Sequence, residues 1–198
     1  MLTTIAADIR ANVNRELPRT WPRMMGKLLL APTVHVVVMY RIGAFLYRWR
    51  ITRPLAFILR SFSIIWGSTE IHPGAQIGPG LCLVHSMKVV IGNGAVLGEG
   101  VRIGQGVTIS GDAGRGARNP LRGCPVIGDH VTIGIDAIVM GNVTVGDHSV
   151  IGAQALVIHD VPAWCVATGS PARVVRRLNE SPEGGNADQS PPIAGQPA

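Results

Sequence analysis

The sequence predicts a parallel β-helix built from six-residue repeats. Between Ile71 and Val161 an aliphatic residue recurs at every sixth position and is usually followed by glycine. This period matches neither an amphipathic helix nor an alternating strand. A six-residue unit is too short to bury its own aliphatic side chain, so successive units must stack and share one internal column. Three units would form one triangular coil, and coils would stack at roughly 4.8 Å.

The repeat positions fall into two series that share one register. They are Ile71, Ile77, Leu83, Ile91, Leu97 and Ile103, and then Ile127, Ile133, Val139, Val145, Ile151 and Val157. A single such hexad carries no information, but twelve in register predict a solenoid. The glycine that follows most of them permits a tight corner. We therefore expect a mainly β domain over residues 68–177.

Residues 1–67 lack the six-residue period, and prolines interrupt their apolar runs, so we expect a helical collar there. The run 28–47 contains Pro32 and Arg41, and the run 55–66 is shorter than the roughly 20 residues that a membrane span needs. The favoured interpretation is a collar that packs on the coils or on a neighbouring subunit. The alternative is a helix that lies on a membrane surface, because basic residues accompany Trp21, Trp49 and Trp66.

Charge is sparse and concentrated outside the repeats. The chain of 198 residues carries a formal net charge of +6. Residues 10–60 hold ten Arg and Lys side chains and Glu16 as their one acid. This asymmetry favours an anionic partner, either lipid head groups or a phosphorylated ligand, and no motif indicates nucleic acid. Three cysteines without close spacing favour a reduced, cytoplasmic setting, with the inner face of the membrane as the alternative. Residues 178–198 are expected to be a disordered tail.

The hexads, together with residues 169–175 (Gly-Ser-Pro-Ala-Arg-Val-Val), resemble the left-handed β-helix acyltransferases. The segment 70–78 and the histidine that follows it, His85, resemble the serine acetyltransferase-like branch. The resemblance implies a left-handed β-helix, acetyl-CoA as co-substrate and a homotrimer.

The regular repeat is interrupted between Ile109 and Ile127. Residues 111–123 show no buried periodicity, so we expect a loop over 110–126 that protrudes from the solenoid. The corresponding loop of the resembling family covers the acetyl-CoA site. The resemblance also assigns the acyl donor to four residues, which are Gly111, Gly134, Ala153 and Arg173.

His85 is the candidate catalytic base. Acetyl transfer to an alcohol requires a group that accepts the hydroxyl proton, and a histidine with an ordinary pKa near 6.5 can do so at neutral pH. The pair Val89 and Val90 is expected to add two residues to the coil beside it. Glu70 matches the family's acidic residue, which would hydrogen-bond the histidine, fix its tautomer and stabilise the imidazolium.

Two positions depart from the serine acetyltransferase pattern and bear on the acceptor. Val84 stands where that branch carries an aspartate that holds the substrate's ammonium group, and Cys124 stands where it carries a second histidine. These differences resemble the exopolysaccharide acetyltransferases of the colanic acid type, which share the short N-terminal collar and the Cys-Pro at Cys124. We therefore expect O-acetylation of a sugar hydroxyl in exopolysaccharide biosynthesis. L-Serine is the alternative acceptor, and a non-catalytic membrane-associated scaffold is the alternative of another class.

His130 and His148 lie 18 residues apart in matching Gly-Asp-His segments, so they should stack on successive coils. A catalytic zinc site needs three protein ligands, and the sequence offers no third. His159 occupies a different hexad position. Solvent-exposed corners are therefore the favoured interpretation, and no metal site is predicted.

Overall fold

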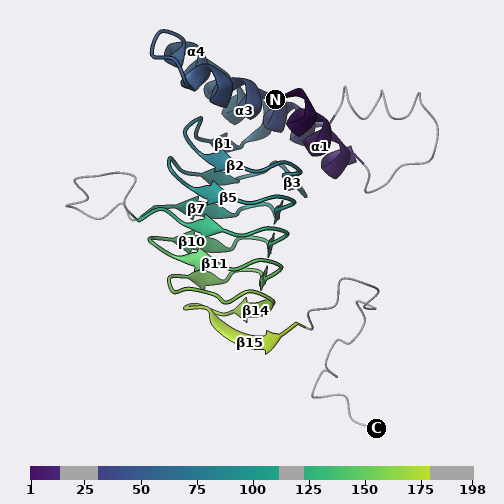
Figure 1. Cartoon of the computed structure of the whole chain (residues 1–198), viewed down its shortest axis with the longest axis vertical. Coiled ribbons are helices and arrows are strands. Elements are labelled where there is room, and N and C mark those ends of the chain that lie inside the picture. The colour runs from purple at the N-terminus through teal and green to yellow at the C-terminus, as the bar shows by residue number, and fades with distance from the viewer. Residues whose placement is uncertain (14–30, 112–122, 179–198) are drawn as a thin grey trace.

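The structure, a computed structural model, describes residues 1–13, 31–111 and 123–178. It confirms the predicted left-handed parallel β-helix, with helices gathered at the end where the coils begin (Figure 1). Most of the expected loop 110–126 and tail 178–198 lies outside the described residues.

The coils present three faces, each a stack of short strands. Face 1 contains β1 (Glu70–Ile71), β4 (Val90–Ile91), β7 (Thr108–Ser110), β10 (Ile138–Met140) and β13 (Leu156–Val157). Face 2 contains β2 (Gln76–Ile77), β5 (Val96–Leu97), β8 (Val126–Ile127) and β11 (Thr144–Val145). Face 3 contains β3 (Cys82–Leu83), β6 (Arg102–Ile103), β9 (Thr132–Ile133), β12 (Val150–Ile151), β14 (Cys165–Thr168) and the antiparallel β15 (Arg173–Arg177).

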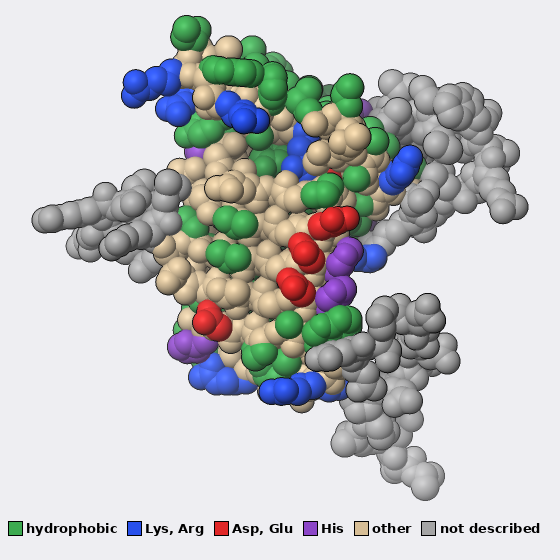
Figure 2. All heavy atoms as spheres, in the orientation of Figure 1, with side chains coloured by type: hydrophobic (Ala, Val, Ile, Leu, Met, Phe, Trp, Pro, Cys, Tyr) green, Lys and Arg blue, Asp and Glu red, His purple; other side chains and the backbone are tan. Residues whose placement is uncertain are grey.

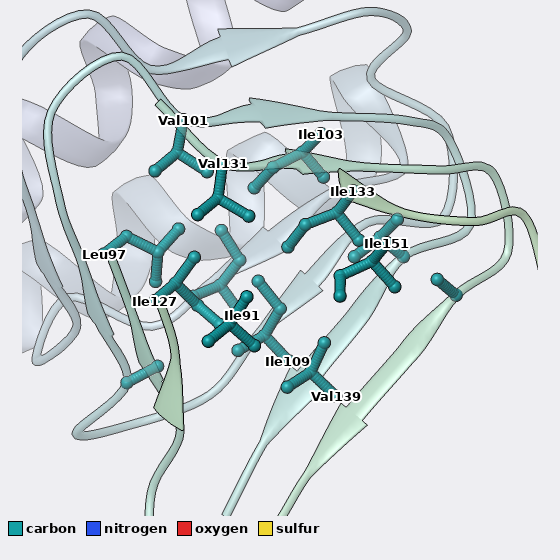
Figure 3. Packing of buried hydrophobic residues seen from close by; sticks show 14 of the residues in the cluster. Ile91, Leu97, Val101, Ile103, Ile109, Ile127, Val131, Ile133, Val139 and Ile151 are labelled. Carbon is teal, nitrogen blue, oxygen red and sulfur yellow. The ribbon is translucent and has the colours of Figure 1, made fainter. Parts of the chain in front are cut away.

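The repeat positions form the predicted internal column. On face 1, Ile91 pairs with Ile109, and Ile109 pairs with Val139. All three side chains are fully buried, and Figure 3 shows them packing against one another inside the coils. Burial of each such side chain contributes about 1.5–3 kcal/mol. The hexad period therefore fixes both the register of the coils and most of the core.

The first coil is longer than the second, and the prediction of where its extra residues lie was wrong. Ile71 pairs with Ile91, which lies 20 residues later in the chain, whereas Ile91 pairs with Ile109, which lies 18 residues later. The first coil therefore contains two additional residues. Val89 is fully buried and Val90 pairs with Thr108, so neither residue is inserted. The addition lies in the corner 84–88, because an outward corner can lengthen without disturbing the aliphatic column.

Three described helices form the collar, which covers the first coil (Figure 1): α1 (Leu2–Val13), α3 (Pro32–Tyr47) and α4 (Arg53–Gly67). Proline stands at the start of α3 and of α4, where its missing N–H costs no hydrogen bond. The helix α4 ends at Ser68, whose φ of 50° is left-handed. Within the described ranges, no helix is long and apolar enough to cross a membrane.

A buried ion pair joins the collar to the first coil. Asp8 of α1 is 1% exposed, and its carboxylate accepts a bond of 2.7 Å from Arg41 Nε of α3. The same carboxylate accepts the Leu81 backbone N–H at 3.0 Å, while Arg41 donates to the carbonyl oxygens of Ile77 and Gly78. These backbone groups belong to the first coil and have no preceding coil to bond. The pair therefore satisfies an edge that would otherwise be open.

Asp8→Asn should lower the free energy of unfolding by about 3–5 kcal/mol, because it leaves the Arg41 guanidinium buried without its counter-charge. Urea unfolding measures this directly. The matched control is Asp160→Asn, since the Asp160 carboxylate is exposed and accepts the Thr144 N–H. The control should change stability by less than about 0.5 kcal/mol. Equal effects of the two substitutions would refute the docking role of Asp8.

Candidate functional site

His85 lies on the corner that leads from face 3 to face 1, in the lengthened segment 84–88 between β3 and β4. Its side chain is exposed. Ser68 and Thr69, the two residues that follow α4, hold this corner on the C-terminal side of His85. Thr69 Oγ1 donates to the Ser86 carbonyl, and the Lys88 N–H donates to the Ser68 carbonyl at 2.8 Å. On the preceding side, the Val84 N–H donates to the Ile103 carbonyl at 2.9 Å. The backbone on each side of the exposed His85 is therefore held in place, which is the support that a reactive group needs.

A helix also reaches the strand that precedes His85. Asn12 of α1 donates to the Leu81 carbonyl at 2.7 Å and accepts the Leu83 N–H at 2.9 Å. Leu83 is two residues before His85. The collar thus pairs with the free edge of β3 as a further strand would.

The corner between face 3 and face 1 recurs on each coil, and we call it the 3–1 corner. Most of the residues assigned to the acyl donor lie on it. Backbone hydrogen bonds of 2.8–2.9 Å join the coils along this corner. The N–H groups of Val84, Gly104 and Gly134 donate to the carbonyl oxygens of Ile103, Ile133 and Ile151, respectively. Val84, Gly104 and Gly134 therefore stack on successive coils. A Cβ atom at Gly134 would lie 2.6 Å from the Ala153 backbone nitrogen, so only glycine fits there.

Arg173 lies at the end of this corner. It begins β15 and pairs with Thr168 of β14, whose methyl group packs against Gly152. Gly152 immediately precedes Ala153. From His85 to Ala153 the corner crosses three coil steps, which is about 14 Å at the usual strand spacing. The structure thus places His85, Gly134, Ala153 and Arg173 along one outer corner.

Gly111 and Cys124 lie together on a different corner, the 1–2 corner between face 1 and face 2. A Cβ atom at Gly111 would be 3.1 Å from Cys124 Sγ. Cys124 Sγ donates to the Asn93 carbonyl at 3.2 Å, and burial raises the pKa of the thiol. The thiol is therefore protonated at neutral pH and is a poor nucleophile. Within one subunit, the width of face 1 separates this pair from His85.

Glu70 occupies β1 on face 1, and its carboxylate forms an ion pair with Arg60 of α4. Within the described residues of this subunit, no hydrogen bond joins Glu70 to His85. The predicted contact between them stays a prediction. Sequence analysis did not anticipate Arg60, because the pair joins a helix to a strand through packing that no repeat pattern encodes.

His72 is a second histidine near Glu70 that the sequence analysis did not single out. Its Nδ1 accepts the Gly74 N–H at 2.9 Å, and its ring meets the edges of Tyr47 and Phe57, both at 5.7 Å between centroids. Burial lowers its pKa, with a further lowering from Arg60 and an opposing effect from Glu70. The sequence did contain a signal for His72. It directly follows Ile71, at a position where most hexads have glycine.

The third corner, between face 2 and face 3, carries the predicted histidine stack. The rings of His130 and His148 lie 5.1 Å apart, and Trp164 extends the stack at 4.1 Å from His148. Figure 2 shows acidic and histidine side chains next to one another on the surface of the solenoid. The acids are bonded to backbone: Asp129 accepts the Glu99 N–H and Asp147 accepts the Asp129 N–H. In the described part of the chain, no three candidate ligands converge on a metal site.

Comparison with known proteins places this geometry in a family. The family model for the bacterial transferase hexapeptide (six repeats) matches residues 124–159. The serine acetyltransferase of Synechococcus elongatus is 34% identical over 177 residues, which cover 89% of this chain and 70% of that protein. The serine acetyltransferase of Mycobacterium tuberculosis is 36% identical, with 93% and 77% covered. The chain belongs to the serine acetyltransferase family of hexapeptide-repeat transferases.

Solved structures of serine acetyltransferases also resemble this chain. Serine acetyltransferase from Brucella abortus in complex with coenzyme A matches this chain with a TM-score of 0.79 and 31% identity, covering 90% of this chain and 68% of that one. The soybean enzyme complexed with serine matches with a TM-score of 0.77 and 34% identity, covering 87% and 68%. Membership of this family makes the protein an acyltransferase.

The expectation of a sugar acceptor in exopolysaccharide biosynthesis is contradicted by these relatives. They are named serine acetyltransferases and align over most of the chain at 34–36% identity. The sequence analysis gave too much weight to two side chains, Val84 and Cys124. The agreement of the family framework over the whole solenoid outweighs them and supports the alternative, serine.

The pKa of His72 offers a test of the charges around Glu70. Because burial and Arg60 favour the neutral imidazole, the NMR titration midpoint of His72 should lie below its ordinary value of about 6.5. Arg60→Gln should raise the midpoint, since it removes a nearby positive charge, and Glu70→Gln should lower it further. Shifts in the same direction for both variants would contradict the arrangement of His72, Arg60 and Glu70.

Proposed function

We propose that this protein is a serine O-acetyltransferase, which transfers the acetyl group of acetyl-CoA to the hydroxyl of L-serine and releases coenzyme A. The product, O-acetyl-L-serine, would serve cysteine biosynthesis. The observation that carries the proposal is the line of His85, Gly134, Ala153 and Arg173 along one corner, in a chain whose relatives are serine acetyltransferases. Two of those relatives have been solved with coenzyme A, which supports the choice of donor.

The donor is an elongated molecule and suits an elongated corner. Its phosphates would lie toward the exposed Arg173, and its pantetheine arm would run along the coils past Ala153 and Gly134. A glycine at 134 leaves the backbone open to close approach. The thioester would then reach the first coil, beside His85.

His85 would act as general base. Its imidazole takes the proton of the serine hydroxyl as that oxygen attacks the thioester carbonyl. The tetrahedral intermediate collapses, the C–S bond breaks, and the coenzyme A thiolate recovers the proton from the imidazolium. Glu70, held by Arg60, would supply the carboxylate that stabilises the imidazolium. Transfer is direct, since the protonated thiol of Cys124 does not form an acetyl-enzyme.

We further propose a homotrimer, with each site between two subunits. Met87 and Ile135 are exposed on the 3–1 corner, and Ile138 and Met140 are exposed on the adjoining face 1. Side-by-side packing of three solenoids would bury this apolar surface. It would also bring the 1–2 corner of one subunit, with Gly111 and Cys124, against the His85 corner of the next. Such packing would unite the residues that a single chain keeps apart. We also propose that the chain divides into three parts. These are the collar 1–67, the β-helix 68–177 with its loop 110–126, and the tail 178–198.

Thiol release from acetyl-CoA in the presence of L-serine tests the catalytic assignment. The wild-type protein should release coenzyme A, and His85→Asn should lower kcat by about 10²–10⁴-fold, the usual contribution of general base catalysis. The matched control is His130→Asn, because His130 is also exposed but lies between β8 and β9, on the corner between faces 2 and 3 and outside the proposed site. Full turnover by His85→Asn, or release no faster with L-serine than without it, would overturn the proposal.

Val84 provides a second test, which concerns the acceptor. This side chain is 37% exposed beside His85 and offers no partner to an ammonium group. Val84→Asp should lower KM for L-serine about 10–100-fold, because a hydrogen bond to a charged group contributes about 1.5–3 kcal/mol. Val84→Asn controls for size and polarity without charge and should change KM much less. Equal effects of Asp and Asn would show that Val84 does not face the serine ammonium group.

A further inference from the structure

The helix α4 buries its small side chains and exposes its large apolar ones. Ala56, Ser63 and Gly67 face inward and are buried. The opposite stripe carries Leu55, Ile58, Phe62, Ile65 and Trp66, which we call the collar face. Among these, Ile65 is 80% exposed and Trp66 is 64% exposed. The spacing of three and four residues places them on one side of the helix. A soluble helix normally has the reverse arrangement, so the collar face is built to be covered by something else.

The turn before α4 adds positive charge to this apolar surface. Residues 48–51 read Arg-Trp-Arg-Ile, and all four side chains are exposed, with Ile51 at 94% and Trp49 at 52%. Neither Arg48 nor Arg50 forms an ion pair within the described residues. Between residues 31 and 69 the sequence contains five arginines and no acidic residue. Figure 2 shows apolar and basic side chains together at the collar end of the molecule.

We infer that the collar face docks on an anionic lipid surface. Apolar side chains enter the boundary between head groups and acyl chains, arginines meet the phosphates, and tryptophan favours that boundary. No described helix is long enough to span, so the collar lies on the surface. Because the collar occupies one end of the solenoid, α4 can rest on a plane while the coils extend away from it (Figure 1).

A second copy of the chain fits this face less well. If two collar faces met, residues 31–69 of neither copy would offer an acidic side chain to pair with Arg48 or Arg50 of the other. Anionic lipid supplies both the apolar phase and the counter-charge. In the proposed trimer, three-fold symmetry places all three collars at one end, so three weak contacts would act together.

Vesicle flotation tests the inference on the full chain. The wild-type protein should float with vesicles of mixed phosphatidylglycerol and phosphatidylcholine and remain unbound with phosphatidylcholine alone. The double variants Ile65→Ser with Trp66→Ser and Arg48→Ala with Arg50→Ala should each lower the bound fraction about tenfold, and high salt should weaken wild-type binding. The matched controls are Val175→Ser and Arg177→Ala. Both residues are exposed, and both lie on β15 at the opposite end, so neither change should affect flotation.

Failure of the wild-type protein to float, or equal flotation by the collar variants, would overturn the inference. A second measurement separates self-association. Suppose that the wild-type protein does not bind vesicles and that the collar variants lower the mass of the assembly in vesicle-free sedimentation. The collar face would then join copies of the chain, and the lipid inference would be wrong. Acetyl transfer in vesicle-free solution should be unchanged in all these variants. A failure of flotation would therefore not count against the proposed activity. A failure of acetyl transfer would likewise not count against the lipid inference.

Discussion

The structure depends on one constraint: a six-residue unit cannot bury its aliphatic side chain unless the next coil covers it. Ile91, Ile109 and Val139 show the result, a fully buried column in which each residue rests on its equivalent in the next coil. The interior of the described coils is therefore filled mainly with aliphatic side chains. Reactive and binding residues are confined to the outer corners and faces, where glycine corners let coils and ligands approach closely.

Stacking also creates two ends that must be covered. At the first coil, Asp8, Arg41 and Asn12 bond backbone groups that have no preceding coil. At the last coil, β15 turns back antiparallel on β14. The end of the collar also shapes the site, because Ser68 and Thr69, the two residues that follow α4, hold the His85 corner. The collar thus links stability to the position of the candidate base.

The sequence predicted what repetition encodes and missed what depends on single long-range contacts. The hexad period gave the column, the coil register and the stack of His130 on His148, because each follows from spacing alone. It misplaced the two added residues, since Val89 looks like an insertion until its burial is known. The pair Glu70 with Arg60 and the shifted pKa of His72 arise from helix packing that no period describes. The acceptor was mispredicted because Val84, Cys124 and the short basic collar were given more weight than the family framework of the whole solenoid.

The central claim is that the 3–1 corner, joined to a neighbouring subunit, is the acyl-donor site. A crystal structure of the protein with coenzyme A tests this most directly. The account predicts density along the corner between two subunits, with the thiol beside His85, the pantetheine arm over Gly134 and Ala153, and the phosphates toward Arg173. Coenzyme A bound at the histidine stack of the third corner, or bound to one isolated subunit with its thiol remote from His85, would contradict the account.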